Sequence, residues 1–378
     1  MTSNGTFNSA PNSIPSSTLS NISDENAARS ANCTAADHPQ AAPVRTALVI
    51  GAAGGVGTEL CLALLRAGWR VRAFSRRIPH WLATLPDSHA AEWITGDAMD
   101  AAAVLAAAEQ VQVIAHTVNP PGYRDWDKWV LPMLDNTLQA ASAVGARVLL
   151  PGTIYNFGIP ERVMDGCHVL DEQTPAAPRT AKGAIRVEME RRLQAAAQRG
   201  DCRVLIVRAG DYFGANSGNS WFAQGMLQAG KPLRRLLRLT AAGVGHQWAY
   251  LPDVAATMVA LLEHERRLEA FACFHMRGHW DEDGLQLIRA AQQVQGNTRL
   301  PVYAFPWWLL RLASPLVRLC AELYEVRHLW QTAVRMPNDR LLAVLGYEPH
   351  TPLPQAMAET LEGLGCIERP RRLATGAL

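Results

Sequence analysis

Three charged residues stand four positions apart in TPAAPRTAKGAIRVEME, residues 174–190: Lys182, Arg186 and Glu190. On an α-helix this spacing places the three side chains along one face. Two neighbouring cations can bind an anionic group, and a desolvated lysine can transfer a proton. The stretch therefore indicates an anion-binding or proton-transferring site, or else a charged helix face that only contacts water.

Hydroxyl side chains stand close to the ends of two apolar stretches. Thr153 and Tyr155 belong to LLPGTIYNFG, and Tyr212 belongs to VLIVRAGDYFG. A threonine can hydrogen-bond a substrate oxygen, and a phenol can exchange a proton with it. Thr153, Tyr155, Lys182 and Arg186 are therefore candidates for a catalytic centre. Tyr212 is a further donor to consider.

A glycine-rich turn, GAAGGVG, stands between an apolar stretch and one with helical spacing. Gly51, Gly54 and Gly57 allow a tight turn, a close approach of the backbone to a pyrophosphate, and close packing of helix on strand. The helix start, with Gly55 and Val56, then offers N–H groups to the phosphates. The pattern predicts a dinucleotide-binding turn.

The end of the next expected strand indicates which dinucleotide would bind. An NAD site usually has an acidic residue about 20 positions further on, which binds the ribose 2′-hydroxyl. This chain has Ser75 there, followed by Arg76 and Arg77. A guanidinium suits a 2′-phosphate, so the sequence predicts NADP, with NAD as the alternative. The alternative is that Arg76 and Arg77 only contact water at the end of the strand and bind no phosphate.

Alternating strands and helices must position these candidates. Such alternation predicts an α/β fold: a Rossmann-type, doubly wound parallel sheet with helices on both faces. Strands are expected at 45–50, 70–77, 91–97, 111–118, 147–155 and 202–210, and helices at 58–69, 100–110, 129–145 and 179–199.

The sequence divides into four parts. Residues 1–43, rich in Ser, Asn, Thr, Ala and Pro, are expected to be a disordered tail. Residues 44–265 form the predicted NAD(P)-binding Rossmann domain, in which 210–245 contribute to a substrate lobe. Residues 266–365 are the predicted C-terminal substrate lobe, smaller and mostly helical, and 366–378 a second tail.

Composition and charge exclude several kinds of partner. The formal net charge of +2 is too small to indicate nucleic acid, and no basic patch with interleaved aromatics is present. The seven cysteines form no C-x-x-C pair, so no metal site is expected. Arg311 and Arg318 interrupt the most apolar stretch, which favours a packed helix over a membrane span. With no visible secretory signal, we expect a cytoplasmic protein that binds a small-molecule substrate.

Several motifs occur in a consistent order over roughly residues 46–265: the glycine turn, TGDAMD, VIAHTVNPP, GTIYNFG, RAGDYFG and QWAYLPDVAATMVALLE. Together they resemble the extended and atypical short-chain dehydrogenase/reductase superfamily, with its NAD-dependent epimerases and dehydratases of nucleotide sugars. The resemblance implies a Rossmann fold and an oxidoreductase or epimerase/dehydratase-like enzyme. Such an enzyme moves a hydride between nicotinamide and a carbonyl or carbinol carbon. Helix-pair homodimers are common in this superfamily.

The resemblance also implies roles for single residues. Asp97 corresponds to the acid that contacts the adenine ring, and His116 and Thr117 lie where the chain passes the nicotinamide ribose. Thr153 falls at the family's catalytic Ser/Thr. Asp253 matches an acid with a structural role.

The family's catalytic Tyr-x-x-x-Lys pair lacks its tyrosine here. Aligning on Glu190 puts Arg186 at the lysine and Lys182 at the tyrosine position. Aligning Lys182 as the lysine puts Pro178 at the tyrosine. Either Lys182 is itself the acid, or Tyr155 reaches the substrate, or proton transfer is lost and the cations bind the cofactor's ribose and phosphates. The last alternative leaves a non-catalytic NADP-binding sensor or assembly protein.

Aromatic and small polar residues are candidates for a substrate pocket. Tyr123, Trp126 and Trp129 follow the fourth expected strand, although aromatics at such spacing also pack helices. The segment GANSGNSWF, 214–222, falls near the expected sheet edge, where ligands bind. Further candidates are His246 and Trp248.

Overall fold

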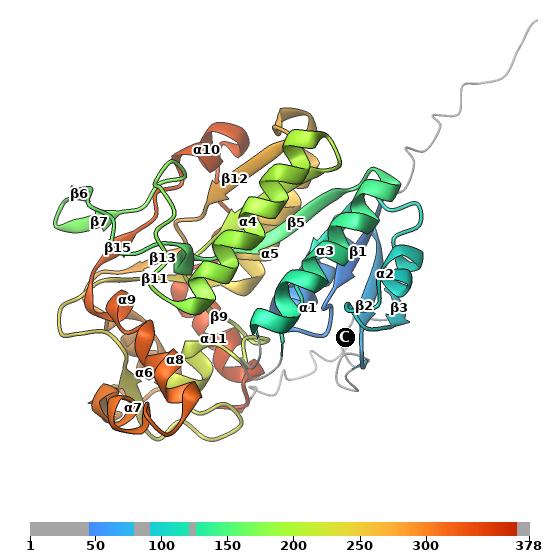
Figure 1. Ribbon diagram of the computed structural model, residues 1–378. Coiled ribbons are helices and arrows are strands. Elements are labelled where there is room, and N and C mark those ends of the chain that lie inside the picture. The colour runs from blue at the N-terminus through green and yellow to red at the C-terminus, as the bar shows by residue number, and fades with distance from the viewer. Residues whose placement is uncertain (1–44, 79–90, 121–125, 369–378) are drawn as a thin grey trace, which may run out of the picture. The chain divides into compact units, whose positions relative to one another are not determined.

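A parallel sheet of seven strands carries the fold, in the order β12–β8–β5–β4–β1–β2–β3 (Figure 1). The computed structural model describes residues 45–78, 91–120 and 126–368, so the predicted N-terminal tail and most of the C-terminal tail lie outside the described residues. The strand order reverses between β1 and β4, the position at which such sheets bind ligands beyond the strand ends. The strands are β1 (Thr46–Ile50), β2 (Arg70–Ser75), β3 (Glu92–Thr95), β4 (Val113–His116), β5 (Arg147–Gly152), β8 (Arg203–Arg208) and β12 (Phe271–His275).

The strands contribute to two cores because successive side chains point to opposite faces. In β1, Ala47 and Val49 pack with α1 and α5, whereas Leu48 and Ile50 pack with α2, α3 and α4. Figure 1 shows α3 and α4 side by side over one face. The predicted doubly wound α/β architecture is therefore confirmed. The helices are α1 (Gly55–Arg66), α2 (Ala101–Ala107), α3 (Trp126–Val144), α4 (Ala181–Arg199) and α5 (Leu251–Glu263).

Helix α4 carries the charged stretch 182–190. The Thr180 hydroxyl accepts a hydrogen bond from the Gly183 N–H at 2.9 Å and caps the helix. Gly200 ends it in the left-handed conformation, with φ +79°. Lys182 therefore lies in the first turn of α4, and Arg186 one turn further on.

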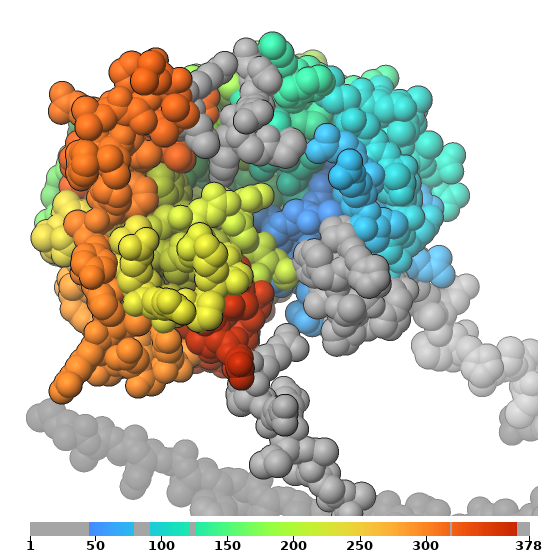
Figure 2. Space-filling view, turned by 90° about the horizontal axis from the view of Figure 1, so that it is seen from below, coloured from blue at the N-terminus to red at the C-terminus, as the bar shows by residue number. Residues whose placement is uncertain are grey.

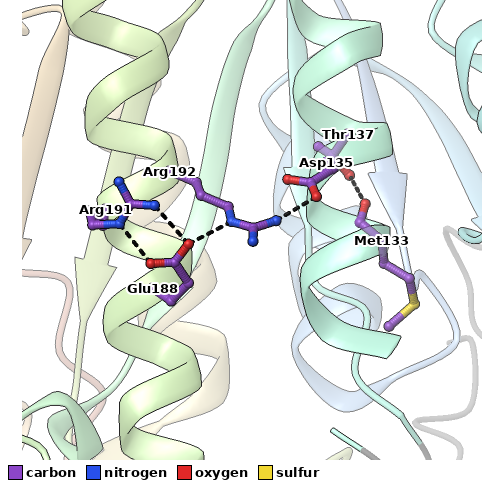
Figure 3. A network of polar contacts seen from close by, with 6 residues as sticks. All are labelled: Met133, Asp135, Thr137, Glu188, Arg191 and Arg192. Atoms are coloured by element: carbon purple, nitrogen blue, oxygen red, sulfur yellow. Dashed lines mark hydrogen bonds and ion pairs between the residues drawn. The ribbon is translucent and has the colours of Figure 1, made fainter. Parts of the chain in front are cut away.

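Charged side chains join α4 to α3 (Figure 3). The Arg192 guanidinium lies between two carboxylates, with Nη1 2.5 Å from Asp135 Oδ2 of α3 and Nε 2.8 Å from Glu188 Oε1 of α4. One guanidinium thus bridges both helices on the outer face of the domain. This bridge helps to fix α4 relative to the sheet.

The sheet continues past the expected domain boundary at residue 265. Strand β12 pairs in parallel with β8, and Phe271 lies opposite Val204. Four of its five residues are buried, so FACFH shows no alternation of polar and apolar residues. For this reason the sequence pattern did not reveal it as a seventh strand.

The lobe combines short strands with helices, and its core includes Phe213, Trp248 and Trp330. The expected helical C-terminal part is confirmed, although short strands lie among the helices. No helix in the described ranges is both long and apolar enough to cross a membrane. The lobe and its connections contain β6 (Val163–Met164), β7 (Cys167–Val169), β9 (Asp211–Phe213), β10 (Leu236–Arg238), β11 (His246–Tyr250), β13 (His279–Asp281), β14 (Val302–Ala304), β15 (Val334–Arg335), α6 (Gln286–Val294), α7 (Trp307–Ala313), α8 (Arg318–Glu325), α9 (His328–Gln331), α10 (Asp339–Leu345) and α11 (Leu353–Gly363).

Candidate active site and dinucleotide turn

The glycine turn packs tightly against the end of β4. Gly51 has φ +88°, and a Cβ there would lie 2.7 Å from Val118 Cα. A Cβ on Gly57 would lie 2.8 Å from Thr117 Oγ1, which itself donates to Ile50 O at 2.8 Å. Any side chain at these two glycines would push β4 away from β1. The predicted cofactor residue Thr117 therefore has a visible role in holding the turn.

The start of α1 is suited to an anion. Its N-cap, Gly54, has no side chain to cap the helix, and the first turn holds no acidic residue. The lobe segment 214–222 touches this start, since a Cβ on Gly55 would meet Asn216 O. Asn216 also donates to Glu59 Oε1 at 2.8 Å. Figure 2 shows residues near 50, in blue, between the yellow lobe segment and the cyan part of the sheet domain.

The residues expected to discriminate between NADP and NAD lie at the end of β2. The Ser75 hydroxyl donates to Arg77 O at 3.0 Å, which shapes the turn. The side chains of Arg76 and Arg77 are exposed beyond it. Asp97, also exposed, follows neighbouring β3, and its Oδ1 accepts from Met99 N–H at 3.0 Å. These residues follow adjacent strands at the carboxyl edge of the sheet.

The side chain of His116 is buried against α3. It is 2% exposed, and its Nδ1 lies 2.8 Å from Thr137 Oγ1 of α3. Because Thr137 donates its own hydrogen to Met133 O, Nδ1 carries the ring proton in this network. Burial, assisted by the charge of Arg186, lowers the pKa of His116 to about 3. His116 is therefore neutral, and its side chain positions α3 under the site.

Tyr155, Asp211 and His246 form a chain of hydrogen bonds. The Tyr155 hydroxyl donates to Asp211 Oδ1 at 3.1 Å, and Asp211 Oδ2 lies 2.8 Å from His246 Nε2. The His246 ring stacks on Trp330, with centroids 4.0 Å apart and planes at 15°. The three residues come from the loop after β5, from β9 and from β11. Asp211 was not predicted as a site residue, although it directly precedes Tyr212 in RAGDYFG.

Thr153 stands two residues before Tyr155 in the sequence, and the first turn of α4, which carries Lys182, packs against Tyr155. Thr153 Oγ1 accepts from the Tyr155 N–H at 3.2 Å and begins the short helix Ile154–Asn156. A Cβ on Gly183 would meet Tyr155 O, so the first turn of α4 packs directly on this loop. The structure thus places Thr153 and Tyr155 beside the first turn of α4, whereas the Lys182 amine pairs with Glu322.

The three charged residues of α4 each have a partner on a different element. Lys182 Nζ lies 2.9 Å from Glu322 Oε2 of α8, and Arg186 Nη2 donates to Asn119 Oδ1 at 2.9 Å. Both cations also lie over the ring of Trp126. Lys182 and Arg186 therefore do not form a helix face that only contacts water.

The third residue, Glu190, forms an ion pair with Arg208 of β8. Arg208 Nη1 in turn lies 3.0 Å from His275 Nε2 on β12. Burial, together with the charge of Arg208, lowers the pKa of His275 to about 3. This buried network ties α4 to two strands and stabilises the helix that carries the site.

The remaining pocket candidates lie in several places. Trp126 is 7% exposed beneath the cations, whereas Trp129 is exposed to solvent. Tyr212 packs on the core beneath α1 and α5, and burial raises the pKa of its phenol to about 12. Trp248 is buried in the lobe core. Tyr123 lies outside the described residues.

Comparison with known proteins places this geometry in a family. The sequence model of the NAD dependent epimerase/dehydratase family matches residues 47–273, and no curated protein matches the sequence. The fold is similar to that of a UDP-glucose 4-epimerase from Bifidobacterium longum in complex with NAD+ and UDP, with a TM-score of 0.65 and 15% identity over 85% of this chain and 97% of that one. It is also similar to a UDP-glucuronic acid 4-epimerase from Bacillus cereus in complex with NAD, with a TM-score of 0.64 and 17% identity over 84% and 98%. The family match covers more than half of the chain, so the chain belongs to the NAD dependent epimerase/dehydratase family.

Proposed function

We propose that this protein is a nicotinamide-dependent enzyme of the epimerase/dehydratase or reductase type, in which Tyr155 replaces the missing tyrosine of α4. The carrying observation is the Tyr155–Asp211 hydrogen bond of 3.1 Å, formed beside Thr153 and the first turn of α4. In this proposal the Tyr155 phenol gives a proton to the substrate oxygen, or takes one from it, while the substrate carbon gains or loses a hydride. A bound nicotinamide dinucleotide would supply or accept that hydride.

The neighbouring residues support this assignment of roles. Asp211 fixes the phenol, and His246 on its other oxygen gives a route for the proton toward the lobe. Thr153 is proposed to bind the substrate oxygen. Lys182 Nζ lies 2.9 Å from Glu322 Oε2, so its ammonium group is already engaged on the lobe side. We assign Lys182 and Arg186 to binding anionic groups.

The residues of the glycine turn fit a dinucleotide. The positive φ of Gly51 and the uncapped start of α1 offer the backbone groups that bind a pyrophosphate. The solved structures named above contain NAD. We keep NADP as the proposed dinucleotide of this chain, because Arg76 is exposed just after β2 and no acidic residue stands there.

The test compares Tyr155→Phe with Tyr212→Phe. The first step is to denature the purified full-length protein, identify any released dinucleotide, and screen carbonyl compounds and UDP-sugars for turnover. Tyr155→Phe should lower kcat by at least a hundredfold with unchanged dinucleotide affinity, because it removes only the phenolic hydroxyl. Tyr212→Phe is the matched control and should keep its activity. Equal kcat in Tyr155→Phe and the unaltered protein would overturn the assignment.

One observation favours a second function, that of an NADP-binding sensor or assembly protein without turnover. The Lys182–Glu322 ion pair attaches the lobe helix α8 to the helix that would hold the catalytic pair. In that case dinucleotide binding persists, no substrate turns over, and neither Lys182→Met nor Tyr155→Phe changes any measured rate.

A further inference from the structure

We propose that Asp253, His279 and His350 form a binding site for a divalent transition metal. One potential ligand atom from each residue lies within 4.8 Å of those from the other two. Asp253 lies in the first turn of α5, His279 begins β13, and His350 precedes α11. The three residues are far apart in the sequence and form no metal-binding spacing motif. For this reason the sequence analysis predicted no metal.

His279 has a buried nitrogen that a metal would satisfy. The residue is 7% exposed, and its Nε2 has no hydrogen-bond partner among the described residues. A buried polar atom without a hydrogen-bond partner is destabilising, so such atoms usually have one. A metal ion bound by this imidazole would remove the destabilisation.

The two histidine rings are placed to share an ion. Their centroids lie 4.4 Å apart, with planes at 39°. A ring centroid lies roughly 3 Å from an ion bound at about 2.1 Å from one ring nitrogen. With one nitrogen of each ring facing the ion, two rings at this separation would subtend an angle of roughly 90° at it, which suits two adjacent ligands of one metal.

Asp253 is held with its carboxylate toward the same point. It is 8% exposed, and its two oxygens accept from the N–H and the hydroxyl of Thr351, both at 2.7 Å. Each carboxylate oxygen keeps a second lone pair for a metal. Because Thr351 follows His350 directly, the same turn orients the carboxylate and one imidazole, as partners outside the coordination sphere do in metal sites.

The donor set selects the kind of ion. Two imidazoles and one carboxylate suit Fe²⁺, Co²⁺, Ni²⁺ or Zn²⁺, whereas Mg²⁺ and Ca²⁺ prefer oxygen ligands alone. His350 is exposed and marks the side from which an ion would enter. Water would complete the coordination sphere on that side.

A metal here would connect the turn before α11 to the sheet of β13, β11 and β9, which carries Asp211 and His246. It would join the turn before α11 to α5 and to β13, whose His279 lies opposite Trp248 of β11. Two residues before Trp248 in the same strand stands His246 of the candidate active site. We therefore expect metal binding to stabilise the lobe.

The test uses full-length protein without an affinity tag, stripped with EDTA and titrated with Co²⁺ by visible absorption and with Zn²⁺ by calorimetry. One equivalent should bind, with ligand-field bands and a higher Tm. His350→Ala, at an exposed position, should weaken binding at least tenfold and abolish the rise in Tm. His264→Ala is the matched control, because His264 lies at the other end of α5, and it should bind as the unaltered chain does.

Two results would overturn the proposal: no binding of either ion, or equal affinity in the unaltered chain and in His350→Ala. His279→Ala should also lose binding, and if it fails to fold, His350→Ala decides alone. Dinucleotide titration of His350→Ala separates this proposal from the proposed function. Loss of metal with retained dinucleotide binding is the expected result.

Discussion

Lys182 Nζ lies 2.9 Å from Glu322 Oε2, and this ion pair joins the first turn of α4 to α8 of the lobe. The two side chains are only 15% and 18% exposed. The pair thus connects the helix that would hold the family's catalytic lysine with a segment far away in the sequence. It shows why the charged stretch of α4 cannot be understood from the helix alone.

This pair should contribute measurably to stability. A double-mutant cycle of Lys182→Met and Glu322→Gln should give a coupling of about 1–2 kcal/mol in the free energy of unfolding, since both groups are mostly shielded from water. The Asp283–Arg289 pair, with side chains 37% and 52% exposed, is the control and should couple by less than about 0.5 kcal/mol. Equal coupling in the two cycles would contradict the prediction.

Asp211→Asn should reduce turnover more than substrate binding. The amide can still accept from Tyr155, but it loses the charge that links this phenol to His246. We expect kcat to fall about tenfold to a hundredfold, with a changed pH–rate profile and little change in KM. Asp283→Asn, whose side chain is 37% exposed and lies in the lobe, is the control. A purely structural role for Asp211 would lower stability and leave the pH profile unchanged.

Gly57→Ala should damage the dinucleotide turn. The added methyl group would press on Thr117 Oγ1 and on the carbonyl of Gly51. Overpacking of this kind costs about 1–3 kcal/mol, and dinucleotide affinity should fall at least tenfold. Gly218→Ala is the control, because nothing lies within 4 Å of a Cβ there. Urea unfolding and fluorescence titration with NADPH measure the two effects.

Arg76→Asp tests the preference between dinucleotides. If Arg76 binds a 2′-phosphate, an aspartate should repel it and accept the ribose 2′-hydroxyl of NAD instead. The ratio of NADPH to NADH affinity should fall by at least tenfold. Arg299→Asp, an exposed change in the lobe, should leave the ratio as it was. A ratio near one in the unaltered protein would remove Arg76 from the site.

Stability should decrease in acid because of His116 and His275. Burial lowers the pKa of each to about 3, against 6.5 for an ordinary histidine. Between these values the unfolded chain binds more protons than the folded one. The free energy of unfolding should therefore fall with decreasing pH, by up to about 1.4 kcal/mol per pH unit for each histidine. Urea unfolding between neutral pH and about pH 5 measures the slope.

NMR provides a check on the two histidines themselves. The ring protons of His116 and His275 should keep constant chemical shifts over that pH range, since neither ring takes up a proton while folded. A midpoint near the ordinary value for either ring would contradict the prediction.

The sequence alone determined the sheet domain and its glycine turn. Apolar strands, amphipathic helices and glycines are local patterns, because they reflect the periodicity of one element and the φ angle of one residue. They gave six of the seven strands of the sheet in order, and put Thr153 and Tyr155 at the end of the expected strand 147–155, although β5 ends at Gly152. Strand β12 was missed because burial on both sides leaves no period to detect.

Only the tertiary structure decided what the polar side chains contact. Lys182 and Glu322 are 140 residues apart in the sequence, and Tyr155 and Asp211 are 56 apart, yet each pair is in contact. The sequence also could not show that Asp253, His279 and His350 lie close together in space. A hydrogen bond or ion pair depends on distances of about 3 Å between atoms, and only the packing of helices, strands and loops against one another sets those distances.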